Sequence, residues 1–309
     1  MAKRANRFLR DSEESVDTLD LQTVNPEART LPYIVVLAGD SVGRVIKLEP
    51  GRGMVAGRTR RCDIYFNCEN ISREHVRFDM DESGATVLAD LESTNGTLVN
   101  GKRISSVTLE DGDRICMGNV ILRFSLKDDL EYDLQQELYN KATRDPLTNA
   151  YNKRFFMDYM KKEFAHHQRH EKPLSVVFFD LDDFKRLNDT YGHLTGDLVL
   201  KSLAREISDV LREEDVFARF GGEEFVALFR FTAHDKAMLI AGKLLDVVRK
   251  LEFATPIESF KVTATAGVAT YDGSNMDTAE ELLRCADDHL FRGKAQGKDR
   301  VIGFDVSRN

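Results

Sequence analysis

The feature that most constrains the fold is an abrupt change of pattern between residues 126 and 144. Before it, short alternating apolar and polar runs are separated by turn dipeptides such as Asn95-Gly96 and Asn100-Gly101, which accept the positive φ angles of tight turns. After it, amphipathic stretches of helical length alternate with short apolar runs, the pattern of helices packed on a sheet. Because 309 residues leave room for about two domains, the sequence predicts a multidomain chain, an all-β sandwich followed by an α/β domain.

These patterns divide the chain into four expected segments. They are a flexible polar tail at residues 1–30, a sandwich at 31–125, a linker helix at 126–143 and the α/β domain at 144–309. Within the linker, leucines recur at every fourth position, Leu126, Leu130, Leu134 and Leu138. This stripe fits either an amphipathic helix that lies on one of the domains or a short helical dimer stalk.

Charge and composition argue against several classes of function. The formal net charge is −8 and no basic run dominates, which disfavours general nucleic-acid binding. No apolar run is long enough to span a bilayer, and the N-terminal residues lack the core of a signal peptide. The four cysteines show neither a CxxC pair nor a disulfide spacing, so reduced thiols are expected. The sequence therefore predicts a cytoplasmic protein with no membrane or nucleic-acid partner.

Two groups of carboxylates fall at the ends of predicted strands. The run RFGGEEFVALF reads as a hairpin whose glycine pair turns the chain and leaves Glu223 and Glu224 at its tip. The buried run LSVVFFD ends in Asp180, with two more aspartates just beyond it. If these strands are neighbours, Asp180 and Glu223 converge and offer the oxygen ligands that Mg²⁺ prefers. Metal-assisted phosphoryl or nucleotidyl transfer would follow, and the alternative is a solvated acidic rim.

Four motifs follow one another in the second half of the chain: RDPLTNAYNKRFF, FFDLDDFKRLNDTYGHLTGD, RFGGEEF and GKAQGKDR. With them, residues 144–304 resemble the GGDEF domain of bacterial diguanylate cyclases, and their order along the chain makes chance agreement improbable. The resemblance implies a polymerase-palm-like α+β fold and the condensation of two GTP molecules into cyclic di-GMP. It also implies a homodimer in the active state, because each domain holds one GTP and two sites must meet.

The same resemblance assigns the metal site and the catalytic groups. Mg²⁺ or Mn²⁺ would be held by Asp180, by Glu223 and by the backbone carbonyl of Leu181. Glu224 would support a second metal position, and Lys294 would meet the phosphates as a cationic donor. Asp180, Glu223, Glu224 and Lys294 are thus the expected catalytic residues.

Substrate recognition is assigned to five further positions. Asn188 and Asp197 would read the guanine edge, whose N–H donors a carboxylate accepts, whereas adenine presents an acceptor there. The remaining GTP-binding residues are expected to be Phe184, Lys185 and Lys298. The family usually has arginine at the position of Lys298, so a point charge replaces a bidentate phosphate contact here.

Arg212 and Asp215 form an RxxD pattern just before the hairpin. At the corresponding place the family often carries an inhibitory site for its product, where arginine pairs with phosphate and aspartate with guanine. A simple ion pair near a helix end is the alternative. The resemblance favours the inhibitory site and predicts feedback by cyclic di-GMP.

Three stretches of the first half, GRTRRCDIYF, ISREHVRF and LESTNGTLVNG, fall mostly at predicted loops. They resemble the signature stretches of forkhead-associated (FHA) domains, β-sandwiches that bind phosphothreonine peptides. The residues expected to bind the phosphothreonine peptide are Arg58, Ser72, Arg73, Thr94 and Asn95. His75 is expected to have a structural, hydrogen-bonding role.

The phosphopeptide could be the chain's own tail or a segment of another protein. Thr18, followed by Leu21 three positions on, is one candidate phosphosite for a Ser/Thr kinase, and Thr23 is another. A tethered tail has a high effective concentration. Two rival functions stay open: a catalytically silent cyclic di-GMP receptor that uses Arg212 and Asp215, and a phosphopeptide-binding adaptor.

Overall fold

The computed structural model describes residues 30–303, except positions 40, 82, 84, 213–214, 256–257 and 274–275. The predicted phosphosites Thr18 and Thr23 lie outside the described residues. The chain divides into two compact units, Met1–Leu134 and Gln135–Asn309.

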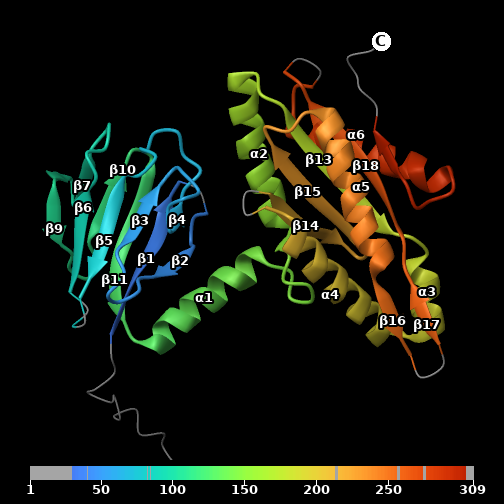
Figure 1. The fold of residues 1–309 in the computed structure, drawn as a ribbon, viewed down its shortest axis with the longest axis horizontal. Coiled ribbons are helices and arrows are strands. Elements are labelled where there is room, and N and C mark those ends of the chain that lie inside the picture. Colours follow the sequence, from blue (N-terminus) through green and yellow to red (C-terminus); the bar gives the residue numbers. More distant parts are fainter. Residues whose placement is uncertain are drawn as a thin grey trace, which may run out of the picture. The chain divides into compact units, whose positions relative to one another are not determined.

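The N-terminal unit is a β-sandwich (Figure 1). One sheet has the order β2-β1-β11-β10-β7-β8 and the other the order β4-β3-β5-β6-β9. Its strands are β1 (Leu31–Ala38), β2 (Val45–Lys47), β3 (Met54–Gly57), β4 (Ile64–Tyr65), β5 (Val76–Met80), β6 (Thr86–Asp90), β7 (Thr97–Val99), β8 (Lys102–Ile104), β9 (Ser106–Thr108), β10 (Arg114–Met117) and β11 (Val120–Lys127). Ile34 and Leu122 of the first sheet share one buried core with Phe78 and Leu88 of the second, which confirms the predicted all-β class.

The C-terminal unit has a six-stranded mixed sheet of order β12-β14-β15-β13-β18-β19. Its strands are β12 (Tyr151–Asn152), β13 (Leu174–Leu181), β14 (Val216–Gly221), β15 (Glu224–Arg230), β18 (Ala264–Tyr271) and β19 (Val301–Gly303), with a separate ribbon of β16 (Glu252–Ala254) and β17 (Ser259–Lys261). Its helices are α2 (Lys153–His170), α3 (Phe184–Tyr191), α4 (His193–Val210), α5 (His234–Lys250) and α6 (Ala279–Ala295).

Helices cover both faces of this sheet (Figure 1). Side chains alternate along the central strand β13, so Val177 and Phe179 join one apolar core with α3, α4 and α5. Val176 and Phe178 point to the other face and pack with α2 and α6. This arrangement confirms the predicted α/β class, and it explains why LSVVFFD is apolar throughout.

The linker helix begins later than the sequence pattern predicts. Helix α1 runs from Asp129 to Thr143, whereas Leu126 pairs with Pro32 in the sheet as part of β11. Leu130, Leu134 and Leu138 remain on the helix and are 78%, 52% and 58% exposed. The opposite side of the first turns is held to the sandwich by an edge-to-face contact between Tyr132 and Tyr33, with ring centroids 5.7 Å apart.

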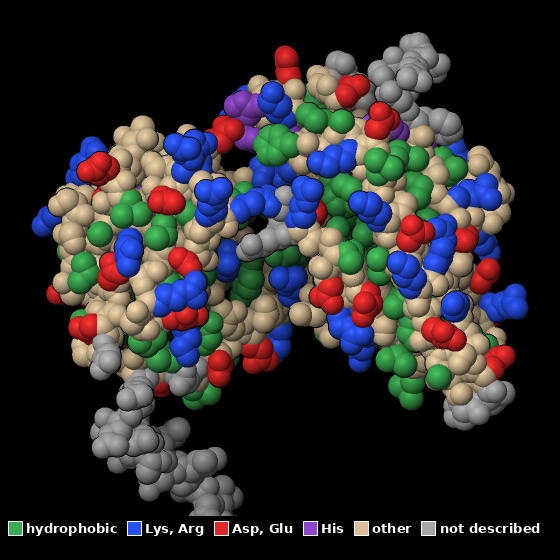
Figure 2. Space-filling model, in the orientation of Figure 1, with side chains coloured by type: hydrophobic (Ala, Val, Ile, Leu, Met, Phe, Trp, Pro, Cys, Tyr) green, Lys and Arg blue, Asp and Glu red, His purple; other side chains and the backbone are tan. Residues whose placement is uncertain are grey.

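The charged surface carries both signs. On the face shown in Figure 2, acidic and basic side chains are interspersed over each unit, which agrees with the absence of a dominant basic run in the sequence. In the described part of the chain, we find no helix with the length and apolar character needed to cross a membrane.

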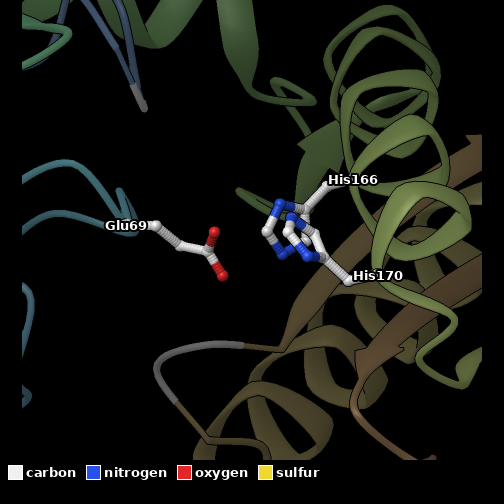
Figure 3. Close-up of side chains that lie close together, drawn as sticks. All are labelled: Glu69, His166 and His170. Carbon is white, nitrogen blue, oxygen red and sulfur yellow. The ribbon is translucent and has the colours of Figure 1, made fainter.

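A group of histidines lies near the C-terminal end of α2. Figure 3 shows His166 and His170 from this helix, with ring centroids 4.7 Å apart; Glu69, also drawn there, belongs to the N-terminal unit. His167, between them in sequence, is fully buried and contacts the ring of Phe231. Burial lowers the pKa of His167 to about 4, so this ring stays neutral at physiological pH.

Candidate active site

The sheet register brings the two predicted groups of carboxylates together. β13 pairs antiparallel with β15, and Asp180 lies directly opposite Glu224. Gly222, with a φ of 43°, makes the turn between β14 and β15, a conformation that glycine adopts without strain. Glu223 occupies this turn, and its carbonyl accepts a hydrogen bond from the Leu181 amide at 3.4 Å. The predicted neighbourhood of the two strands is therefore present, with Glu224 rather than Glu223 in register with Asp180.

Crowding of these carboxylates changes their acidity. Burial is the largest cause of the raised pKa of Asp180, and the charge of Glu223 raises it further against the opposing effect of Lys294. The pKa of Glu224 is raised by burial and then by Asp180. Both groups therefore ionise less readily than free carboxyls, and a bound divalent cation would offset the repulsion among the carboxylates. Oxygen donors of this kind fit Mg²⁺ or Mn²⁺.

Lys294, near the end of α6, reaches into the same cluster. Its Nζ contacts the Asp180 carboxylate and donates to the carbonyls of Asp180 and Leu181 at 3.1 and 3.0 Å. It also donates to Asp182 Oδ1 at 2.9 Å. The predicted catalytic lysine thus lies beside the expected metal ligands Asp180 and Leu181.

Asp182 is a member of this cluster to which the sequence assigned no role. Its side chain is only 4% exposed and accepts hydrogen bonds from the hydroxyls of Thr263 and Thr265, each at 2.7 Å. The Asp299 amide donates to it as well, at 3.0 Å. The only sequence signal was its place in the acidic run FFDLDDF, which does not distinguish it from its neighbours.

The predicted guanine-reading residues lie on α3 and α4. Asn188 Oδ1 faces Gly196, where a Cβ atom would come within 1.9 Å of it, and Asp197 is the next residue along α4. Among the described residues, no hydrogen-bond donor reaches this buried oxygen. A buried acceptor without a partner is destabilising, and a guanine N–H is a suitable donor for it.

The other predicted GTP-binding residues are distributed around this end of the domain. Phe184 is buried at the start of α3, and Lys185 beside it is exposed. Lys298 follows α6, has a left-handed backbone with a φ of 61°, and donates to Asp183 Oδ1 at 2.6 Å.

The RxxD pair lies at a different place, at the end of α4. The Arg212 amide donates to Asp215 Oδ2 at 3.1 Å, and both residues line a pocket of about 670 Å³. Lys236, Lys243 and Lys250 of α5 line the same pocket, and sequence reasoning missed them. Their spacing of seven residues places them on one side of a helix, the one signal that could have grouped them.

The predicted phosphothreonine residues gather at the loops of the sandwich. The Thr94 amide donates to Ser72 Oγ at 3.0 Å, and the Arg58 amide donates to the Ser72 carbonyl at the same distance. Asn95 Nδ2 donates to the Asn70 carbonyl at 2.8 Å. The guanidinium-bearing residues Arg58 and Arg73 are both exposed, so the cluster joins ordered hydroxyls with accessible positive charge.

His75 has the structural contacts that were expected of it. It is fully buried, and its Nδ1 accepts from the Ser72 amide at 2.9 Å. Its Nε2 lies 3.4 Å from the Gly96 carbonyl. The ring thereby connects the loop of Ser72 with the loop that contains Thr94 and Asn95.

Comparison with known proteins agrees with this division. Residues 54–118 match the model of the FHA domain, and residues 142–300 match that of the diguanylate cyclase GGDEF domain. Diguanylate cyclase DgcP of Pseudomonas aeruginosa is 36% identical over 161 residues, which are 52% of this chain and 24% of DgcP. The probable diguanylate cyclase DgcT of Escherichia coli is 36% identical over 172 residues, 54% of this chain and 37% of DgcT. The chain thus spans well under half the length of these relatives.

Solved structures show the same fold in the second half. Diguanylate cyclase SiaD of Pseudomonas aeruginosa, in complex with its activator SiaC, matches with a TM-score of 0.52 and 34% identity over 57% of this chain and 66% of SiaD. The coiled coil and GGDEF domain of DgcB from Caulobacter crescentus, in complex with c-di-GMP, matches with a TM-score of 0.53 and 26% identity over 57% of this chain and 92% of DgcB. Since the GGDEF match extends over more than half of the residues, the chain belongs to the GGDEF diguanylate cyclase family and carries an FHA domain ahead of its GGDEF domain.

Proposed function

We propose that this protein is a diguanylate cyclase that condenses two GTP molecules into cyclic di-GMP and releases two pyrophosphates. The observation that carries the proposal is the convergence of Asp180, Glu223, Glu224 and Lys294 where β13 meets the β14–β15 turn. In each half-reaction, the 3′-oxygen of one GTP attacks the α-phosphorus of the other. The bond from that phosphorus to the pyrophosphate oxygen breaks, and pyrophosphate leaves with the electron pair.

Different residues of this site would bind the metal ion, bind the phosphates and accept the proton of the attacking hydroxyl. Asp180, Glu223 and the Leu181 carbonyl would hold Mg²⁺ or Mn²⁺, with Glu224 beside them. Such an ion, when bound, neutralises the phosphates and lowers the pKa of the attacking hydroxyl. Lys294 would meet the phosphate charge, and Lys298 would add a second cation. Burial raises the pKa of Glu224, so its carboxylate would take up a proton more readily than an ordinary glutamate does.

Selection of GTP would rest on α3 and α4. The unpartnered Oδ1 of Asn188 and the carboxylate of Asp197 can both accept from the N–H groups of guanine. Adenine lacks these donors and would leave both acceptors unpaired, which is the situation that gives strong discrimination. The use of GTP also supports action in the cytoplasm.

We further propose that the protein acts as a dimer and that its FHA domain regulates it. Two GGDEF domains must face one another to join two nucleotides, and the exposed leucines of α1 offer a surface for dimerisation. The FHA domain would bind a phosphothreonine peptide through Arg58, Ser72, Arg73, Thr94 and Asn95. That peptide would come from a Ser/Thr kinase substrate, either the chain's own tail at Thr18 or Thr23 or a separate protein.

We also propose that cyclic di-GMP inhibits the enzyme by binding at Arg212 and Asp215. The pocket of Arg212 and Asp215 adds Lys236, Lys243 and Lys250, and this local positive charge suits the two phosphates of cyclic di-GMP. A silent receptor would need this pocket alone, whereas the carboxylate cluster favours the cyclase over a receptor or a phosphopeptide adaptor.

A direct assay tests the proposal. Purified protein is incubated with GTP or with ATP in the presence of Mg²⁺, and the products are separated by mass. We expect cyclic di-GMP from GTP and no cyclic dinucleotide from ATP. Equal use of both nucleotides would contradict the role given to Asn188 and Asp197.

A further inference from the structure

Asp182, just after β13, is joined to two distant stretches of the chain: the start of β18, and the end of α6 with the loop that follows it. Its two oxygens accept from Thr263 and Thr265, at the start of β18, and from the Asp299 amide in the loop after α6. Its Oδ1 also accepts from Lys294 on α6. Its own amide donates to the Thr263 carbonyl at 2.9 Å. With these contacts the carboxylate has almost no freedom to move.

The fixed carboxylate has a direct consequence for Lys294. A lysine side chain is long and flexible and loses rotamer entropy when it is ordered. Here the ammonium is held between Asp182 on one side and Asp180 on the other, with two carbonyls below it. Asp180 is an expected metal ligand, so its charge would be shared when a metal binds. Asp182, satisfied by two threonines, would then be the remaining carboxylate that keeps Lys294 in place.

The hydrogen bond from the Asp299 amide also connects Asp182 to the loop after α6, which carries the expected phosphate-binding residue Lys298. Lys298 and Asp299 both have left-handed backbones, with φ angles of 61° and 47°, a conformation that is uncommon for residues other than glycine. Asp182 Oδ2 accepts from this turn, and Arg249 contacts the Asp299 carboxylate at 2.8 Å. The turn that presents Lys298 is therefore held by Asp182 from the inside of the domain.

We propose that Asp182 is a positioning residue, which acts through Lys294 to hold the ammonium where it meets the triphosphate of GTP. The proposal rests on the proposed function, since it takes GTP as the ligand. In this role Asp182 would make no contact with GTP itself. It would hold the ammonium of Lys294 in position and, through the Asp299 amide, fix the backbone of the loop that carries Lys298.

The test is a double-mutant cycle on GTP affinity. Asp182→Asn keeps the shape of the side chain but removes its charge, and Lys294→Met removes the ammonium and keeps the aliphatic chain. Affinity is measured by calorimetry on the full chain with Mg²⁺ and the α,β-methylene analogue of GTP, which cannot release pyrophosphate. Glu163→Gln is the matched control, because it breaks a buried pair with Arg230, and neither of these residues contacts Asp182 or Lys294 in the cluster.

The two backgrounds give distinct results. In the otherwise native chain we expect Asp182→Asn to weaken binding by about tenfold or more, and in the Lys294→Met chain by less than about threefold, because residues in one network are not additive. Glu163→Gln is expected to lower the melting temperature and leave the affinity unchanged. Should Asp182→Asn fail to fold, Thr265→Val removes one support of the carboxylate and takes its place in the same cycle, with a smaller expected loss.

Failure of this inference differs from failure of the proposed function. If the native chain binds the analogue and Asp182→Asn weakens it equally in both backgrounds, or in neither, Asp182 does not act through Lys294. If the native chain binds no guanine nucleotide at all, it is the proposed substrate that is wrong, and this inference is wrong with it.

Discussion

The side chain of Arg219, on β14, holds the turn of the GGEEF sequence through hydrogen bonds to the Gly222 carbonyl. Its Nε and one terminal nitrogen donate to the Gly222 carbonyl at 2.9 and 2.7 Å, and the other terminal nitrogen donates to Asp145 Oδ1 at 3.1 Å. Asp145 in turn accepts from the amide and hydroxyl of Thr148. The position of Glu223 is thus tied to the segment that directly follows α1.

Arg219→Ala should therefore reduce catalysis more than stability. Loss of the bidentate contact frees the Gly222 carbonyl and lets Glu223 move, and a misplaced catalytic group can lower the rate by about a hundredfold. Arg205→Ala serves as the control, because Arg205 is 71% exposed and pairs with its neighbour Glu206. Rates of cyclic di-GMP formation and melting temperatures of both variants check this. Equal activity of Arg219→Ala and Arg205→Ala would contradict it.

Because the pKa of Glu224 is raised, its ionised form should lower the stability of the folded protein, by an amount that depends on pH. A carboxyl with a folded pKa above its unfolded value favours the protonated folded state, so its charge opposes folding once the pH exceeds the raised value. We expect Glu224→Gln to raise the melting temperature of the metal-free protein near neutral pH. The gain should shrink as the pH falls through the raised pKa, because the native carboxyl then becomes protonated. A gain that grew toward acid pH would contradict this reading.

His167 predicts a loss of stability in mild acid. Its pKa is lowered to about 4 by burial, whereas an unfolded histidine takes up its proton near 6.5. Protons then bind the unfolded state first, so stability should fall as the pH is lowered from about 6.5 to 4, by about 3 kcal/mol from this group.

The groups that face His167 are Glu163, Arg230, His166 and the Lys172 carbonyl. Urea unfolding of the native chain and of His167→Gln at a series of pH values isolates its share. Parallel pH curves for the two proteins would show that His167 makes no such contribution.

The FHA domain predicts phosphate-dependent peptide binding. Arg58→Ala should weaken a phosphothreonine peptide by about tenfold or more, since charge-assisted contacts to a phosphate are strong. The melting temperature should change little, because the Arg58 side chain is exposed. Fluorescence anisotropy with a Thr18 peptide, phosphorylated and unphosphorylated, measures both the effect and the choice of site. A Thr23 peptide or a library peptide that binds more tightly would move the proposal from Thr18 to another source.

Local patterns in the sequence predicted the two fold classes and most of the carboxylate cluster. The apolar run before Asp180 and the glycine pair before Glu223 are signals within a few residues, and they required only that two strands be neighbours. The start of α1 was placed three residues early, because Leu126 continues the four-residue spacing yet belongs to β11.

Long-range partners were beyond the reach of such patterns. Asp182 differs from Asp183 only through its contacts with Thr263, Thr265, Lys294 and Asp299, which folding brings from about a hundred residues away along the chain. The same holds for the lysines of α5 that join Arg212 and Asp215 in one pocket. Their grouping depends on how α5 packs beside α4, which the spacing within either helix does not determine.

The most direct test of the central claim compares the native chain with Glu223→Gln in one assay of GTP turnover with Mg²⁺, in which products are identified by mass. This substitution keeps the side-chain shape and removes the charge that would hold the metal. We expect cyclic di-GMP from the native chain and a loss of about a hundredfold or more in the variant, with the fold retained by circular dichroism. Equal rates for the two proteins would contradict the metal site at the tip of the hairpin.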